Sequence, residues 1–151
     1  MELASRVGER AGARPPRPVL LATLGVPFEP AACEFAVDTA VELGEPLIVA
    51  VVVELPPLAM SVNLGYDQLE DSPAEAEAFR APAALASSLG VRVERLRVKS
   101  PRPLEALLEL TAERAPSVLV FGPDRTRLRG RRYRKAERAI RERAACLVWL
   151  P

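Results

Sequence analysis

The residues best able to do chemistry in this chain are arginines and lysines gathered in one stretch near the C-terminus. Between Arg125 and Arg143 there are ten basic residues and two acidic ones. A guanidinium can hold a phosphate group through two parallel hydrogen bonds, so this stretch suits an anionic ligand. Four of the arginines stand before or at the start of a predicted helix: Arg125, Arg127, Arg129 and Arg131. We therefore predict an anion site formed by side chains as one use of this stretch.

The same basic stretch fits two other uses. The first is a solvated helix face that pairs with acidic helices earlier in the chain. The stretch has a net charge of +8, and because the whole chain has a formal net charge of +1, the remaining residues carry −7. The second is a surface for an acidic or phosphate-bearing partner. We do not expect nucleic-acid binding, because Tyr133 is the only aromatic residue of the stretch and provides no stacking platform.

The chain contains no histidine, which excludes several kinds of catalytic and metal site. Histidine is the usual general base at neutral pH and the commonest zinc ligand. No paired carboxylates, metal-ligand spacing or activated nucleophile stand out in its place. We predict no catalytic residue, no metal site and no required cofactor. The two cysteines, Cys33 and Cys146, are predicted to be small apolar residues of the core rather than reactive thiols.

Strand and helix patterns alternate along the chain. Strands are predicted at Val19–Leu24, Leu47–Val53, Val91–Val98, Val118–Phe121 and Cys146–Leu150. Helices are predicted from Pro30 to Gly44, over Asp71–Leu89, from Pro103, and over Arg131–Ala144. Alternation of strands with helices of this length indicates right-handed crossovers around a parallel sheet.

Some positions carry more specific predictions. Apolar and charged residues alternate in Val91–Val98, with one break at the adjacent Glu94 and Arg95, which is typical of a half-exposed strand at a sheet edge. Pro82 should kink or interrupt the second helix. The residues expected to be buried are Phe79, Ala83, Ala86 and Leu89 in the second helix and Leu104, Leu107, Leu108 and Ala112 in the third.

Residues 18–151 are predicted to form one domain, preceded by a disordered segment over residues 1–17. No apolar run reaches the roughly 20 residues that a membrane span requires. The first residues also lack the apolar core of a secretion signal. We expect a cytoplasmic protein without a membrane span.

The second half of the chain resembles the C-terminal half of universal stress proteins. In that family a helix of the EALLELAEE type leads into a strand ending in glycine, and a glycine-rich loop, a helix and a strand beginning near CPV follow. The corresponding parts here are Glu105–Arg114, Val118–Gly122, Pro123–Gly130, Arg131–Ala144 and Cys146–Leu150. The first half fits the family's opening strand and helix with VLLATLGVPFEPAACEFAVDTAVELG. The resemblance covers residues 18 onward as a pattern rather than a motif match.

This resemblance implies a single α/β domain of the adenine nucleotide alpha-hydrolase-like type. Its five-stranded, doubly wound parallel sheet would have the order 3-2-1-4-5. Ligands of such sheets bind where the strand order reverses, here near Leu24, Gly25 and the segment Gly122–Gly130. The connection containing Leu58–Tyr66 would pass over this crevice. We expect it to be a loop packed down by its own side chains, with a lid or partner contact as the alternative.

The family's ATP-binding members carry the motif G-x2-G-x9-G-[S/T] after the fourth strand. Gly122 matches its first glycine, but the second falls on Arg125. With the one-residue deletion that aligns Cys146, the final pair falls on Arg134 and Lys135. Gly130 lies inside the loop but at no motif position. The family's nucleotide-contacting aspartate at the end of the first strand falls on Leu24.

These substitutions lead to a specific functional expectation. Glycines let backbone N–H groups approach phosphates closely, and an arginine in their place fills that space. We predict a non-catalytic stress or regulatory binding protein that does not hold ATP in the family's manner. The alternative is a nucleotide or phosphate-ligand module that uses the Arg-rich loop, with Gly122, Arg125, Arg127, Gly130, Arg134 and Lys135 as candidate ligand residues. An enzyme of a related nucleotide α-hydrolase-like fold is disfavoured, because the chain lacks histidine.

The last strand is the candidate dimer interface. Family members commonly pair this strand with its counterpart, which would also hide an exposed sheet edge. The resemblance therefore implies a homodimer through Leu147, Val148, Trp149 and Leu150, with Trp149 as the anchor. Pairing should stop by Pro151, which has no N–H to donate.

Overall fold

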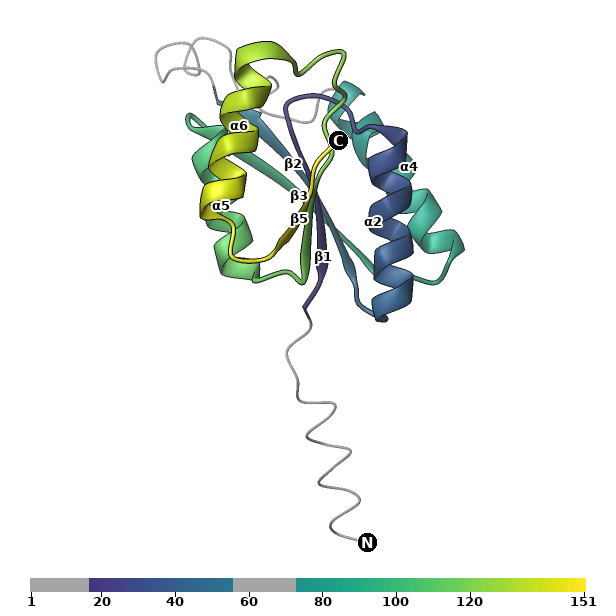
Figure 1. Cartoon of the computed structure of the whole chain (residues 1–151). Helices are drawn as coiled ribbons and strands as arrows, with labels where there is room; N and C mark the ends of the chain where they lie inside the picture. Colours follow the sequence, from purple (N-terminus) through teal and green to yellow (C-terminus); the bar gives the residue numbers. More distant parts are fainter. Residues whose placement is uncertain (1–16, 56–72) are drawn as a thin grey trace, which may run out of the picture.

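The computed structural model describes residues 17–55 and 73–151, which form three layers around one sheet. Five parallel strands lie in the order β3-β2-β1-β4-β5, with helices on both faces (Figure 1). The predicted fold class and strand order are therefore confirmed. The predicted disordered segment 1–17, apart from Arg17, and the segment Leu58–Tyr66 lie outside the described residues.

The strands lie where the sequence predicted them, with some ends shifted by a residue or two. They are β1 (Val19–Leu24), β2 (Leu47–Glu54), β3 (Val93–Ser100), β4 (Val118–Phe121) and β5 (Leu147–Trp149). Every residue of β1 is buried, as expected for a parallel strand covered on both faces. Strand β3 forms one edge of the sheet, as its alternating pattern predicted, and β5 forms the other.

Proline and glycine fix several helix ends. The helices are α2 (Pro30–Leu43), α4 (Pro73–Ser88), α5 (Pro103–Arg114) and α6 (Gly130–Arg143). Proline suits a first turn because the first N–H groups of a helix have no partner within it. Gly44 ends α2 in the left-handed conformation, with φ +65°. Helices α2 and α4 cover one face of the sheet, and α5 and α6 cover the other (Figure 1).

Alternation along the strands divides the apolar side chains into two cores. From β1, Leu20, Ala22 and Leu24 join the core under α5 and α6. Val19 and Leu21 join the core under α2 and α4. Because successive side chains of a strand point to opposite faces, each central strand contributes to both cores.

The prediction for α4 is partly wrong. Phe79 and Ala86 are buried, but Ala83 is only half-buried and Leu89 is 51% exposed. Leu89 follows the last helical residue, so it leaves the buried stripe. The helix also continues through Pro82, which is itself buried, so Pro82 does not interrupt it, and the alternative of a kink stays a prediction. Packing on either side of the proline outweighs the one helical hydrogen bond that it removes.

The prediction for α5 is wrong at one position. Leu107 and Leu108 are buried and Leu104 is half-buried, but Ala112 is exposed. Thr111, one turn after Leu107, is buried in its place. Its hydroxyl donates to the Leu107 carbonyl at 2.8 Å, which satisfies the polar group inside the core.

Gly122, directly after β4, lies against the first turn of α2. Its N–H donates to the Ala22 carbonyl at 3.0 Å, and its carbonyl accepts from the Glu29 N–H at 3.0 Å. A Cβ added at Gly122 would collide with the Cβ of Ala32 in the first turn of α2. The packing of this helix therefore requires a glycine here.

We expect Gly122→Ala to lower the free energy of unfolding by about 1–3 kcal/mol, the usual range for an overpacked site. Urea denaturation of the variant and the parent protein measures this difference. Adding Ala32→Gly should restore part of the loss, because it removes the colliding Cβ, although glycine inside a helix itself costs about 1 kcal/mol. An unchanged urea midpoint for Gly122→Ala would contradict the packing role.

Both cysteines have the environment of core residues. Cys33 is buried in α2, and burial raises the pKa of its thiol to about 11. Cys146 is half-buried just before β5, and burial raises its pKa as well. Because the thiolate is the reactive form, both thiols are poor nucleophiles at neutral pH.

We expect neither thiol of the native protein to react quickly with a chromogenic disulfide reagent at pH 7. After unfolding in urea, both thiols should react within the mixing time. Cys33→Ser and Cys146→Ser variants assign any native reaction to one position. Rapid stoichiometric labelling of Cys33 in the folded protein would be the contrary result.

Candidate ligand-binding cleft

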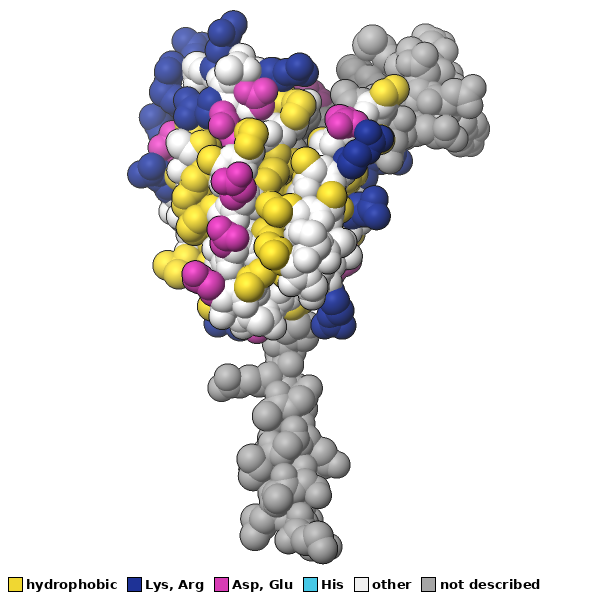
Figure 2. Space-filling model, turned by 90° about the vertical axis from the view of Figure 1, so that its right-hand side faces the viewer, with side chains coloured by type: hydrophobic (Ala, Val, Ile, Leu, Met, Phe, Trp, Pro, Cys, Tyr) yellow, Lys and Arg dark blue, Asp and Glu magenta, His cyan; other side chains and the backbone are white. Residues whose placement is uncertain are grey.

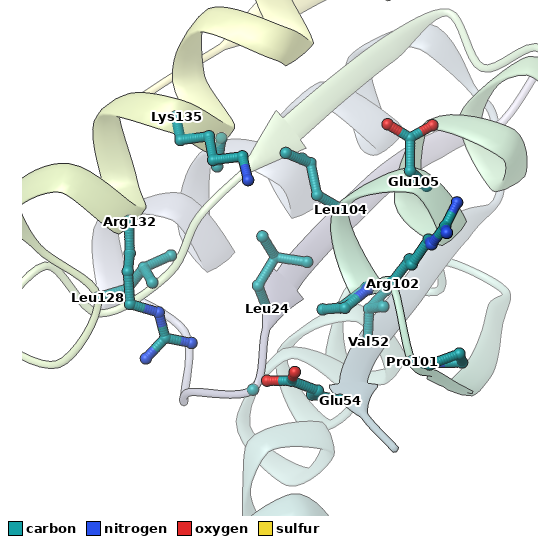
Figure 3. Close-up of a pocket in the computed structure, with 13 residues that line it drawn as sticks. Leu24, Val52, Glu54, Pro101, Arg102, Leu104, Glu105, Leu128, Arg132 and Lys135 are labelled. Atoms are coloured by element: carbon teal, nitrogen blue, oxygen red, sulfur yellow. The ribbon is translucent and has the colours of Figure 1, made fainter. Parts of the chain in front are cut away.

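A cleft of about 600 Å³ opens beyond the carboxyl ends of β1 and β2, beside the first turns of α5 and α6. It lies close to the reversal of strand order between β1 and β4, where open parallel sheets generally bind ligands. Its apolar lining comes from Leu24, Val52, Leu104 and Leu128 (Figure 3). Gly25 adds a stretch of backbone without a side chain. The two residues predicted at the crevice, Leu24 and Gly25, thus lie in the cleft.

Charged side chains surround this apolar lining. Arg132 and Lys135 extend from α6 toward the cleft, while Arg102, Glu54 and Glu105 lie on the other side (Figure 3). Glu54 is the last residue of β2 and faces Arg132 across the opening (Figure 3). Arg102 and Glu105 belong to the start of α5.

Glu105 is held by an ion pair. Arg143 donates from Nη1 to both of its carboxylate oxygens, at 2.7 and 2.9 Å. This hydrogen bond lowers the pKa of Glu105, and the charges of Arg102 and Lys135 lower it further. Among the residues that the structure describes, three cations of the cleft face one carboxylate besides the paired Glu105, namely Glu54. The cleft is therefore suited to a ligand that carries an anionic group.

The loop between β4 and α6 uses its backbone donors inside the protein. The N–H groups of Arg127 and Leu128 donate to the Asp124 carbonyl at 3.1 and 2.9 Å. The Thr126 N–H and hydroxyl donate to the Asp124 carboxylate at 2.9 and 2.7 Å, and these bonds lower the pKa of Asp124. Asp124 thus closes the loop into a compact turn.

The same loop is tied to the segment between β1 and α2. The Asp124 N–H donates to the Pro27 carbonyl at 2.8 Å. The Arg125 N–H donates to the carboxylate of Glu29 at 3.1 Å. Pro123 has no N–H, and that of Gly122 belongs to the sheet. From residue 122 to residue 128, no backbone N–H is left over for a phosphate.

Arg125, at the second glycine position of the family motif, turns away from the cleft. Its guanidinium lies over the ring of Tyr133, with Cζ 3.4 Å from the ring centroid. Its Nη1 lies 3.5 Å from the carbonyl oxygen of Pro151, and its Nε is buried without a hydrogen-bond partner. Tyr133 in turn stacks on Phe121, with 6.2 Å between the ring centroids. Arg125 therefore links the loop, α6 and the end of the chain.

The structure separates the other predicted ligand residues. Lys135 lines the cleft, but Arg134 lies on the outer side of α6 and Arg127 is exposed on the loop. Gly130 begins α6 with φ +64° and does not line the cleft. Of the predicted loop residues, the cleft thus contains Lys135 alone.

Four charged cleft residues were not predicted individually: Glu54, Arg102, Glu105 and Arg132. Glu54 and Arg102 could have been predicted from their positions, because they lie at or just beyond the carboxyl ends of β2 and β3. Arg132 belongs to the basic stretch, and only the rotation of α6 distinguishes it from Arg131 and Arg134. A helical projection from the buried Tyr133, Ala136 and Ile140 would have placed it.

The predicted pairing of the basic helix with the acidic helices does not occur. Helix α6 lies on the opposite face of the sheet from α2 and α4 (Figure 1). Its cations instead pair with Glu105 of α5, through Arg143, and with Glu137 of α6 itself, through Arg141 at 2.8 Å. In the parts of the chain that the structure describes, no ion pair joins α6 to α2 or α4.

The predicted dimer residues are the three residues of the edge strand β5 and Leu150, which follows it. Leu147 is 74% exposed, whereas Val148 and Leu150 pack against the core under α5 and α6. Trp149 stacks on Phe35 of α2, with 5.3 Å between the ring centroids. Trp149 is therefore occupied within the same molecule.

Two features are absent from residues 17–55 and 73–151. No group of three or more Cys, Asp or Glu residues there is placed to hold a metal ion. No helix there is both long and apolar enough to cross a membrane.

Comparison with known proteins agrees with this architecture. The model of the universal stress protein family matches residues 16–150. A universal stress protein family member from Burkholderia pseudomallei has 19% identity and a TM-score of 0.59, over 89% of this chain and 95% of its own. No curated protein sequence is significantly similar to the chain.

Three of the similar solved structures contain nucleotides, one of them a universal stress protein in complex with cAMP. The universal stress protein from Archaeoglobus fulgidus in complex with dAMP has 16% identity and a TM-score of 0.60, over 87% of this chain and 94% of its own. A universal stress protein family protein from Arabidopsis thaliana with AMP bound has 14% identity and a TM-score of 0.53, over 87% and 90%. At these identities the likeness concerns the fold. Because the family model spans nearly the whole chain, the chain belongs to the universal stress protein family.

Proposed function

We propose that the protein is a non-catalytic binding protein of the universal stress protein family that does not hold ATP through a backbone phosphate loop. The observation that carries this proposal is the closed hydrogen bonding of residues 122–128. A backbone cradle needs free N–H groups that point at the phosphates. Between residues 122 and 128 each such group already has an acceptor, so a triphosphate could use this part of the loop only by breaking these bonds. The lack of histidine supports the non-catalytic part, and the cytoplasmic location stays a prediction.

A second candidate function is the binding of a small phosphate-bearing ligand by side chains. It is favoured by the cleft, where Arg102, Arg132 and Lys135 surround an apolar lining. These cations replace the Arg-rich loop of the sequence prediction, since Arg125 is occupied by Tyr133. The complexes of similar structures with cAMP, dAMP and AMP support a ligand of mononucleotide size. Such a ligand would present its base or another flat apolar group to Leu24 and Val52.

Thermal unfolding with AMP, ATP and sulfate tests both candidates, because a ligand that binds the native state raises the melting temperature. We expect ATP to give no larger shift than AMP, since residues 122–128 have no backbone donor free for its outer phosphates. Any shift should be lost in Arg132→Ala/Lys135→Ala. Arg125→Ala should keep the shift while lowering the melting temperature without ligand, because a cation–π contact contributes about 0.5–2 kcal/mol.

Arg92→Ala/Arg95→Ala, at two exposed cations outside the cleft lining, is the matched control for lost positive charge. A shift of several degrees with ATP alone, retained in Arg132→Ala/Lys135→Ala, would contradict the proposal. If no nucleotide raises the melting temperature, the second candidate function is wrong and the first is unaffected.

We also propose a homodimer that pairs β5 with its counterpart. Support comes from the open outer edge of β5, because a strand edge exposes unpaired backbone groups and favours pairing with another chain. Leu147 is the most exposed of the large hydrophobic residues in the described chain, at 74%. An edge-to-edge contact would cover it.

Sedimentation velocity at physiological salt should give twice the mass of one chain. Leu147→Lys should shift the population to monomer, since a charged residue at an edge strand opposes pairing. Leu89→Lys, at another exposed leucine far from β5, is the control and should leave the dimer intact. Monomeric parent protein, or a dimer indifferent to Leu147→Lys, would refute this interface.

A further inference from the structure

The outer side of α2 carries a row of acidic residues. Glu34, Asp38 and Glu42 follow one another at intervals of four residues, and all three are exposed. At about 1.5 Å per residue they extend along roughly 12 Å of the helix. Figure 2 shows acidic side chains in a line down this face of the molecule. None of the three has an ion-pair partner among the described residues.

Hydrophobic side chains flank this acidic row (Figure 2). Phe35 is 38% exposed and Val41 is 47% exposed, and both belong to α2. A surface with a line of carboxylates between apolar groups is suited to long cationic side chains. The aliphatic part of an arginine can cover apolar area while its guanidinium reaches a carboxylate.

The outer side of α6 carries the complementary row. Arg131, Arg134 and Arg138 are exposed on one side of the helix, at intervals of three and four residues. Their row is about 10 Å long, close to the length of the acidic row. In the described part of the chain, no carboxylate pairs with any of the three.

These two rows cannot meet within one molecule. Helices α2 and α6 lie on opposite faces of the sheet, with both cores between them (Figure 1). The segregation extends through the sequence: residues 18–79 contain eleven acidic residues and no basic one. A molecule with a net charge of +1 but two opposed faces of opposite sign attracts copies of itself.

We propose that the basic side of α6 docks on the acidic side of α2 of a second copy of this chain. The contact is heterologous, because two different surfaces meet, so it leaves one free surface of each kind and allows open chains of molecules. Arginine stems would cover Phe35 and Val41, and guanidinium groups would pair with Glu34 and Asp38. The contact uses no residue of the cleft lining and none of β5 itself, although Phe35 stacks on Trp149 of that strand.

Salt dependence is the first expected property of this association. Exposed charges are screened beyond about 8 Å at physiological ionic strength, and the screening distance is several times longer at low salt. We expect the average mass in sedimentation velocity to rise with concentration at about 20 mM NaCl. At about 300 mM NaCl the dissociation constant should be at least tenfold higher. Performing the series in Leu147→Lys removes pairing through β5.

Charge reversal assigns the two surfaces. Arg134→Glu/Arg138→Glu should abolish the low-salt association, and so should Glu34→Arg/Asp38→Arg. Combining all four changes in one chain should restore it, because the two rows are again complementary and the net charge is again +1. Circular dichroism verifies that each variant is folded.

The matched control is Arg92→Glu/Arg95→Glu, at exposed cations outside α6. It changes the net charge by the same amount as Arg134→Glu/Arg138→Glu and should keep the association. Three results would overturn the proposal: no association at low salt, association that survives reversal of α6, or no restoration by the fourfold variant. Association that disappears after nuclease treatment would also overturn it, in favour of bridging by nucleic acid.

Discussion

Burial of β1 on both faces is the constraint on which the rest of this structure depends. All six of its residues are buried, so helices must cover the sheet from both sides. Strand β1 lies between β2 and β4. The strands before β4 are added on one side of β1 and the later strands on the other, so the strand order reverses beside β1. That reversal, combined with the start of α5 and α6, leaves the cleft above Leu24. The same two-sided covering keeps the acidic α2 and the basic α6 apart.

Where the strand order reverses, hydrogen bonding within the loop after β4 determines which groups can reach a ligand more than the charge of the loop does. A run of arginines after β4 looks ready to bind phosphate, but the loop turns inward. Asp124 and Glu29 accept the donors that a phosphate would use, and Arg125 packs on Tyr133. The cations that do reach the cleft come from the first turns of α6 and from the start of α5. A ligand would therefore meet side chains, which can move, in place of a rigid backbone cradle.

The sequence predicted the fold well because its signals are local and repeated. Apolar runs, helix-starting prolines and Gly44 fixed nearly every element to within two residues, and resemblance to the family supplied the strand order. Individual side chains were harder to place. Leu89 and Ala112 left their predicted stripes because helix ends and rotations shift by fractions of a turn. Arg125 could not be placed in advance, because its position depends on Tyr133 and Pro151, which meet it only in the folded chain.

Gly122 shows that the packing of the fold can by itself require a glycine at a motif position. Its missing side chain makes room for Ala32, and both of its backbone groups are used within the fold. The glycine is therefore needed for the close packing of α2 on the sheet. A glycine at this position is therefore weak evidence for nucleotide binding, because helix packing alone requires it. Residues whose backbone N–H groups are free are the better indicators of a phosphate site.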